Sequence, residues 1–420
     1  MIYSKFGNKF AQEAGILSLM KDMGDALAGG EGECIMMGGG NPGQIPEFQK
    51  RMQQRLQEIS NDEALCKRLL GLYCAPQGEA DFLAALAKLL RNQYGWSVGP
   101  ENICLTNGSQ SGFFLILNMF AGEYDSGGCK KIRLPLTPEY IGYADIGLSH
   151  DFFVATRPKI ERLDEHLFKY RVDFNEISIA EETGAICVSR PTNPTGNVVT
   201  DQEVERLDRL ARAAGVPLII DSAYGGPFPG IIFSEATPLW NENIILCLSL
   251  SKLGLPAVRT GIVIAAEQTI RVLAGMNAIM ALAPAGFGAF LVQKLVESRE
   301  ILALSNTVIR PFYKKKAETA VRLFAEELEG TPYRIHKPEG AIFLWLWFED
   351  LPISSEELYA RLKNRGVLVI SGHHFFPGLE GDDWGHKKEC IRVNYSQEEE
   401  QVRKGIKIIG EEVKNAYGSL

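Results

Sequence analysis

The stretch Ile-Ile-Leu-Cys-Leu-Ser-Leu-Ser-Lys, residues 244–252, sets a lysine directly behind a short apolar run. Such a run predicts a buried β-strand, with Lys252 just past its carboxyl end. Another apolar run ends at Asp221, and an earlier one leads to Asn193 in Asn-Pro-Thr-Gly. Because the carboxyl ends of parallel strands meet at one edge of a sheet, we expect Lys252, Asp221 and Asn193 to lie close together.

Short apolar runs alternate with helical patterns through the middle of the chain, which is typical of a mainly parallel sheet covered by helices. The expected strands are Ile103–Leu105, Ala185–Ser189, Val216–Ile220, Ile244–Leu248 and Gly261–Ala265. One helix is predicted from Ser109 to about Phe120, and a capping box at Thr200–Glu203 predicts another that ends near Ala214. The pattern therefore predicts an α/β fold with a large, doubly wound, mainly parallel sheet.

Beyond about residue 300 the pattern changes to long amphipathic helices and a few strands. The expected strands there are Arg334–Lys337, Ala341–Phe348, Val367–Ile370 and Cys390–Asn394. We interpret them as a second sheet in a smaller α+β domain. The expected division is an N-terminal segment of the small domain at 1–50, a large domain at 51–300 and a small C-terminal domain at 301–420.

The amino-acid composition indicates which kinds of molecule the protein binds. The 420 residues carry a net charge of −8, with a sequence pI near 5.5. Nucleic-acid binding requires clustered Lys and Arg, so we expect small-molecule substrates and no nucleic acid. The eight cysteines include no CxxC pair and the six histidines form no ligand pattern, so we predict free thiols and no metal site.

Two apolar stretches resemble a signal peptide or a membrane span at first sight. The short N-terminal run at 15–20 is closed by Lys21 and Asp22, so a signal peptide is not expected. The uncharged stretch from Val272 to Gln293 is interrupted by Gly and Pro, and we interpret it as buried loop and helix starts. The sequence thus predicts a cytoplasmic protein without a membrane span.

The predicted strand ends carry the groups that pyridoxal 5′-phosphate (PLP) requires. A lysine such as Lys252 can form a Schiff base with the cofactor's aldehyde, and Asp221 can pair with its pyridinium nitrogen. Asn193 and Tyr224 are candidates to hydrogen-bond the phenolic oxygen, and Tyr140 to stack on the ring. An isolated strand-end lysine is more often a snorkelling surface residue, so the ordered combination carries the interpretation.

A phosphate requires backbone N–H groups at a helix start, together with nearby hydroxyls or a cation. Six candidates meet this description: Gly108, Ser109 and Gln110 at a strand-to-helix turn, and Ser249, Ser251 and Arg259 around Lys252. Taken alone, the first three residues are better explained by a plain tight turn. Together with Lys252 and Asp221, they predict an anionic pocket.

Longer strings resemble the valine–pyruvate aminotransferase family of fold-type I PLP enzymes. They are Gly38–Pro46, Pro138–Asp145, Ser189–Asn197, Phe228–Phe233 and His336–Phe343, within matches from about Phe6 to Tyr395. The resemblance implies that Lys252, Asp221 and Tyr224 are catalytic and that Gly40, Asn193 and Arg392 bind substrate. From the pattern alone, Arg392 would be an edge-strand surface residue.

The resemblance also implies a homodimer in which Tyr73 reaches the phosphate of the neighbouring subunit. Two departures from the family pattern bear on this. Arg259 follows Lys252 by seven residues where many relatives have eight, and Tyr73 lacks the usual polar and glycine neighbours.

The expected activity is PLP-dependent transfer of an amino group between small aliphatic amino acids and 2-oxo acids. The favoured pair is valine with pyruvate, giving 3-methyl-2-oxobutanoate and alanine. Alternatives are a carbon–sulfur lyase, or an aminotransferase of other preference, on the same fold. A PLP-sensing regulator would need a basic DNA-binding module, which we do not find before Tyr73. A dehydrogenase would need a strand opening into GxGxxG, which is also missing.

Overall fold

The computed structural model describes residues 2–11, 24 and 34–418. The N-terminal run at 15–20, on which the signal-peptide argument was based, lies outside the described residues. Within the described parts of the chain, no helix has both the length and the apolar character needed to cross a bilayer.

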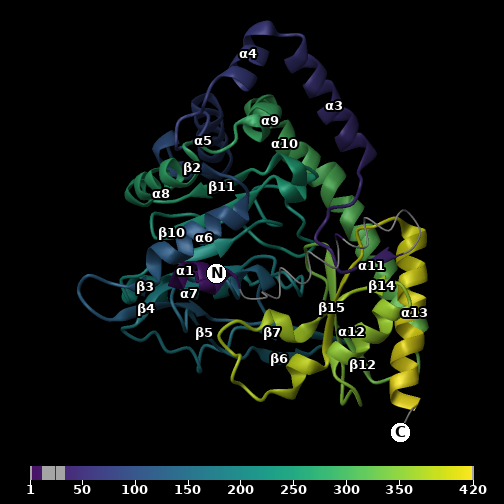
Figure 1. Ribbon diagram of the computed structural model, residues 1–420. Helices are drawn as coiled ribbons and strands as arrows, with labels where there is room; N and C mark the ends of the chain where they lie inside the picture. Colours follow the sequence, from purple (N-terminus) through teal and green to yellow (C-terminus); the bar gives the residue numbers. More distant parts are fainter. Residues whose placement is uncertain (1, 12–23, 25–33, 419–420) are drawn as a thin grey trace.

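The first sheet has eight strands, seven of them in the order β2-β11-β10-β9-β8-β4-β3, while β5 pairs with β4 (Figure 1). Neighbours from β10 through β9, β8 and β4 to β5 run parallel, whereas β11 is antiparallel to β10 and β2, and β3 to β4. The bounds are β2 Ile103–Thr106, β3 Gly122–Glu123, β4 Cys129–Leu134, β5 Phe153–Ala155, β8 Thr183–Ser189, β9 Leu218–Asp221, β10 Ile244–Ser249 and β11 Gly261–Ile264. The predicted mainly parallel sheet is confirmed.

Helices cover both faces of this sheet. Along β10, Ile244, Leu246 and Leu248 pack into one hydrophobic core, whereas Ile245 and Cys247 pack into a second core. The strand is apolar throughout because both of its faces are buried. The first core includes residues of α5 Ala80–Tyr94, α7 Asp201–Ala213 and α9 Phe287–Glu297; the second includes α6 Ser109–Phe120 and α8 Glu267–Ala281.

Two predicted helix starts are confirmed in detail. The Thr200 hydroxyl accepts from the Glu203 N–H, and the Glu203 carboxylate accepts from the Thr200 N–H, so α7 begins with the expected capping box. Helix α6 begins at Ser109, directly after Gly108, whose φ of +87° favours glycine.

The uncharged stretch from Val272 to Gln293 differs from its prediction. It is mostly helical, in α8 and α9, and part of it is exposed: Ile279 keeps 89% of its surface and Leu282 keeps 66%. The prediction of buried loop was wrong because Gly275 and Asn277 lie inside α8 without ending it.

A second sheet has the order β15-β16-β13-β12-β7-β6. Its strands are β6 Lys159–Arg162, β7 Leu167–Arg171, β12 Tyr333–His336, β13 Phe343–Phe348, β15 Ile370–Ser371 and β16 Cys390–Asn394. Strands β6 and β7 come from the middle of the chain, and β7 runs parallel to β12. The domain division at residues 50 and 300 stays a prediction.

The remaining elements frame these two sheets (Figure 1). Helices α11 Arg310–Glu327, α12 Ser355–Asn364 and α13 Glu399–Gly418 accompany the second sheet, and α13 lies along the right margin of the molecule in this view. Strand β1 Ile35–Met36 pairs in parallel with β14 Val367–Leu368, which ties the N-terminal part to the C-terminal part. The other helices are α1 Lys5–Phe10, α3 Pro46–Ser60, α4 Glu63–Gly71 and α10 Glu300–Leu304.

Candidate active site

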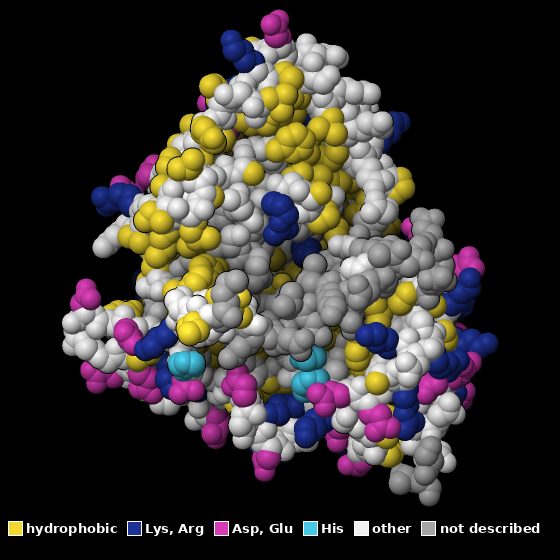
Figure 2. All heavy atoms as spheres, viewed as in Figure 1, with side chains coloured by type: hydrophobic (Ala, Val, Ile, Leu, Met, Phe, Trp, Pro, Cys, Tyr) yellow, Lys and Arg dark blue, Asp and Glu magenta, His cyan; other side chains and the backbone are white. Residues whose placement is uncertain are grey.

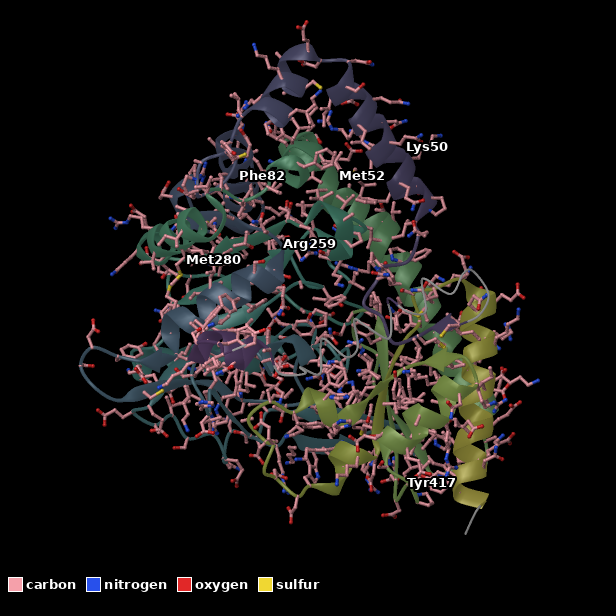
Figure 3. All side chains as sticks on the ribbon, viewed as in Figure 1. Lys50, Met52, Phe82, Arg259, Met280 and Tyr417 are labelled. Atoms are coloured by element: carbon pink, nitrogen blue, oxygen red, sulfur yellow. The ribbon has the colours of Figure 1, made fainter. Side chains whose placement is uncertain are left out.

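A cavity of about 240 Å³ lies where the carboxyl ends of β8, β9 and β10 meet. All but two of the candidate residues line it: Gly40, Ser109, Gln110, Tyr140, Asn193, Asp221, Tyr224, Ser249, Ser251, Lys252, Arg259 and Arg392. Gly108 lies just behind the wall, and Tyr73 is elsewhere. Figure 3 places Arg259 near the centre of the viewed face, where Figure 2 shows basic side chains at a hollow bordered by hydrophobic ones.

Lys252 stands on a short 3₁₀ turn, Ser251–Leu253, that follows β10. Its Nζ donates to the Gly40 carbonyl at 2.6 Å and lies 5.2 Å from the ring centre of Tyr224. Burial, assisted by the charges of Arg392 and Arg259, lowers the Lys252 pKa to about 8. A lysine with such a pKa has an appreciable neutral fraction near neutral pH, as a nucleophile or proton carrier requires.

Asp221 is the buried carboxylate of the cavity floor, at the end of β9. Its Oδ1 accepts from the Ala223 N–H at 2.9 Å, and its Oδ2 accepts from the Tyr143 hydroxyl at 2.8 Å. Burial raises the Asp221 pKa, while these two donors and the charge of Lys252 act against that rise. A carboxylate that is oriented by two donors can pair with a cationic ring nitrogen.

One end of the cavity collects groups that bind anions. The Arg259 Nη1 lies 3.3 Å from the Ser251 hydroxyl, and a Cβ on Gly108 would lie only 2.1 Å from Nη2. Arg259 therefore reaches the start of α6 despite its shorter spacing from Lys252, aided by a φ of +46°. The Gln110 Oε1 is buried here without a hydrogen-bond partner among the described residues.

Arg392 forms the opposite end, and it is only 2% exposed. Its Nη1 donates to Asn193 Oδ1 at 2.7 Å, and its Nη2 donates to the Gly38 carbonyl at 2.5 Å. The guanidinium lies 4.1 Å from the ring centre of Phe343 and 5.2 Å from that of Phe375. The edge-strand interpretation of Arg392 was wrong, because β16 lies between β13 and β15.

A glycine-rich segment, residues 37–41, crosses the cavity with every carbonyl engaged. Besides the Arg392 and Lys252 contacts, the Asn394 N–H and side chain donate to Met37 and Gly39, and the Ser396 hydroxyl donates to Asn41. Asn394 and Ser396 are not among the site residues predicted from the sequence. Their only local signal was their position just after Arg392.

A buried group behind the cavity was also missed. Glu139 accepts from both the N–H and the hydroxyl of Ser189, at 2.8 and 2.5 Å. Burial raises the Glu139 pKa to about 8. Tyr143, the donor to Asp221, was missed as well, because a tyrosine within an apolar run is usually a core residue.

Tyr73 is not brought to this cavity. It is 86% exposed and follows α4, close to other exposed apolar residues. The segment that carries it is tied to α8, since the Asn277 side chain donates to the Pro76 carbonyl at 3.0 Å. Figure 2 shows hydrophobic side chains gathered over this side of the molecule, where Figure 3 labels Met280 of α8. We use the name apolar patch for six of the exposed apolar residues, at the end of α4 and of α8: Leu70, Leu72, Tyr73, Ile279, Met280 and Leu282.

The donor set fits a ligand with two anionic ends. Three cations, Lys252, Arg259 and Arg392, surround the cavity, and in the described chain none of them forms an ion pair with a carboxylate. The one buried carboxylate in the wall, Asp221, is placed to meet a cationic nitrogen. A phosphorylated pyridine with a reactive aldehyde, together with an α-carboxylate, matches this distribution.

Known proteins resemble this chain over nearly all of its length. The family model for class I and II aminotransferases matches residues 149–409. The valine–pyruvate aminotransferase of Escherichia coli is 52% identical over 99% of both chains. The crystal structure of valine–pyruvate aminotransferase from Salmonella typhimurium has a TM-score of 0.88 and 51% identity, and it covers 97% of this chain and 100% of its own.

A more distant structure shares the fold alone. It is an α-aminoadipate aminotransferase from Thermus thermophilus, solved with N-(5′-phosphopyridoxyl)-L-leucine, with a TM-score of 0.76, 19% identity, and coverage of 100% of this chain and 98% of its own.

Proposed function

Because the chain belongs to the class I and II aminotransferases, and within them to the valine–pyruvate aminotransferase family, we propose that it transfers an amino group between valine and pyruvate. The products are 3-methyl-2-oxobutanoate and alanine. Its architecture is that of the fold-type I enzymes, as the sequence predicted. Within the site, the observation that carries the proposal is the placement of Lys252 between two arginines and beside a buried aspartate.

In this proposal the cavity holds PLP. Arg259, with the start of α6, Ser249 and Ser251, holds the phosphate, and Asp221 meets the ring nitrogen. Asn193 and Tyr224 hydrogen-bond the phenolic oxygen, and Tyr140 covers the ring face. When bound, PLP supplies an aldehyde that takes up the amino group and a ring that withdraws electrons from the substrate's Cα.

Lys252 carries the proton. Its amine donates to the Gly40 carbonyl, and with a pKa of about 8 it could both accept and return a proton near neutral pH if the cofactor and substrate were bound beside it. Burial is the largest cause of that pKa shift, so the shift depends on keeping bulk water away from Nζ.

Arg392 holds the α-carboxylate of both substrates. Each of its Nη atoms carries two hydrogens, and the bonds to Asn193 and Gly38 use one on each. The remaining donors, among them the buried Nε–H that has no partner among the described residues, are available to a carboxylate. The same contacts fix the guanidinium plane before substrate arrives.

Small aliphatic side chains are preferred because the wall has no cation left for a second carboxylate. Of the described lining residues, only Lys252, Arg259 and Arg392 are basic, and the proposal already uses all three. Aspartate and glutamate would therefore bury an unpaired charge, which is strongly unfavourable.

The proposed assembly is a homodimer through the apolar patch. Ile279 at 89% and Tyr73 at 86% exposure would be awkward on a monomer, since large apolar patches mark interaction sites. In the dimer, Tyr73 reaches the phosphate in the partner's cavity. The cytoplasmic location stays a prediction.

The visible spectrum of the purified protein, with PLP and single amino acids, tests the proposal. Valine alone should convert the cofactor band, and pyruvate should restore it. Ammonia and pyruvate formed from cysteine-type substrates without a 2-oxo acid would instead indicate the carbon–sulfur lyase. Lys252→Ala should remain folded and lose turnover by at least about 10²–10⁴-fold; near-normal turnover would reject the assignment of Lys252.

A further inference from the structure

Behind the cavity floor, the phenol of Tyr143 donates to Oδ2 of Asp221 at 2.8 Å. Both side chains are buried, and the exposed fraction of Tyr143 is 0%. The same hydroxyl also interacts with the buried thiol of Cys187. Burying a hydroxyl without a hydrogen-bond partner destabilises the folded state. The bond to Asp221 removes that cost for Tyr143.

The Tyr143 ring packs against three other aromatic rings. Its centre lies 5.2 Å from that of Phe113 and 6.4 Å from that of Phe153. Tyr140 stands edge-on to it at 5.5 Å, and the Tyr143 N–H donates to the Tyr140 carbonyl at 3.0 Å. The 3₁₀ turn Ile141–Tyr143 thus sets one tyrosine on the cavity wall and a second one behind Asp221.

We infer that Tyr143 is a positioning residue, whose hydroxyl holds Asp221 as an oriented, charged partner for the cofactor's ring nitrogen. The inference rests on the proposed function, because it gives Asp221 a task only if the cavity holds PLP. A phenylalanine would fill the same space and make the same ring contacts. The hydroxyl is therefore the part of Tyr143 that packing does not require.

The effect of this donor is to favour the carboxylate form of Asp221. A hydrogen bond to the charged form of an acid lowers its pKa, and here it opposes the rise caused by burial. The phenol stays protonated, since burial and the charge of Asp221 raise its own pKa well above the usual value. The titratable groups that interact with Asp221 are Lys252, Tyr140 and Tyr224 in the cavity wall, and Tyr143, Glu139, Cys187 and Cys247 behind it.

A double-mutant cycle with Tyr143→Phe and Asp221→Asn tests the inference on the full chain. Tyr143→Phe should weaken PLP affinity, measured by fluorescence titration of the apoprotein, and should lower kcat for valine, each by about 10- to 100-fold. KM for valine should change little, because Arg392 is untouched. In the Asp221→Asn background, the same substitution should have almost no further effect, since its partner is already changed.

The acid limb of the kcat profile adds a second readout. Without the donor, Asp221 takes up its proton more readily, so the limb should move to higher pH in Tyr143→Phe. Incorporating 3-fluorotyrosine at position 143 keeps the ring and strengthens the donor, so there the limb should move to lower pH. This variant also covers the case in which Tyr143→Phe does not fold.

Tyr417→Phe is the matched control, since that phenol donates to the Glu349 carbonyl at 2.7 Å, far from the cavity in Figure 3. It should leave PLP affinity and the pH profile unchanged. Equal losses in the wild-type and Asp221→Asn backgrounds, or an acid limb that stays in place in both Tyr143 variants, would overturn the inference alone. A wild-type chain that binds no PLP would overturn the proposed function and this inference with it.

Discussion

Arg392 and Asn193 are 199 positions apart in the chain, yet Nη1 of the arginine lies 2.7 Å from Oδ1 of the asparagine. Arg392 belongs to β16 of the second sheet, and Asn193 follows β8 of the first. Since Gly38 accepts from the other Nη, three distant segments meet at one guanidinium. The substrate end of the cavity therefore depends on how the two sheets are held together.

Arg392→Lys should lower kcat/KM for every amino acid by a similar factor, about 10- to 100-fold. An ammonium lacks the planar fork and cannot hold Asn193, Gly38 and a carboxylate in one plane. The bound-cofactor spectrum should persist, because Arg392 is at the far end from Arg259. Steady-state kinetics with several amino acids check this, with the exposed Arg322→Lys as control. Loss of PLP, or an effect on one substrate only, would contradict the role.

Lys252 should react with acylating reagents at lower pH than the exposed Lys50 of the same apoprotein. Only the neutral amine is nucleophilic, and the Lys252 pKa is about 8. Its labelling rate should therefore rise with pH, level off above about 8, and fall about tenfold for each unit below. Trace acetic anhydride and peptide mass spectrometry give this profile, with the exposed Lys50 as internal reference (Figure 3). Coinciding profiles would contradict the shift.

Alanine, 2-aminobutyrate and valine should all complete the first half-reaction, whereas aspartate and glutamate should be poor. One methylene changes binding by only about 1–3 kcal/mol, so the aliphatic series should be graded and not all-or-none. Single-turnover spectra with each amino acid give the rates directly. Aspartate or glutamate outperforming valine would show that a cation was overlooked at the substrate end.

The parts of the fold that the sequence predicted are those with local signals. An apolar run that ends in a functional polar residue marks β9 and β10, and the capping box marks α7. The pairing of β7 with β12 could not be foreseen, because it joins residues 167–168 to 335–336 and follows from packing of the whole chain. Helix α8 was missed because glycine within a helix looks like a breaker, although tertiary contacts outweigh its cost of about 1 kcal/mol.

The residues of the candidate site also divide into those with a local sequence signal and those without one. Lys252, Asp221 and Asn193 each follow an apolar run, and their ordered combination could be recognised from the sequence. Tyr143 contacts Asp221, and Glu139 contacts Ser189, from behind the cavity wall. These contacts exist only in the folded chain, so the residue types alone did not indicate a place in the site. Arg392 lies within a strand, where its pattern resembles that of any edge position, and only the family resemblance singled it out.

If Tyr73 of one subunit completes the cavity of the other, two inactive variants should complement each other. A mixed dimer of Tyr73→Ala and Lys252→Ala chains has one site with both defects and one with neither. Random exchange should then restore about a quarter of wild-type activity, well above either variant alone. The matched control pairs Lys252→Ala with Arg392→Ala: both residues line the cavity of one chain, so no intact site can form. Activity that stays at the average of the separate variants, despite proven subunit exchange, would show that Tyr73 acts within its own chain or not at all.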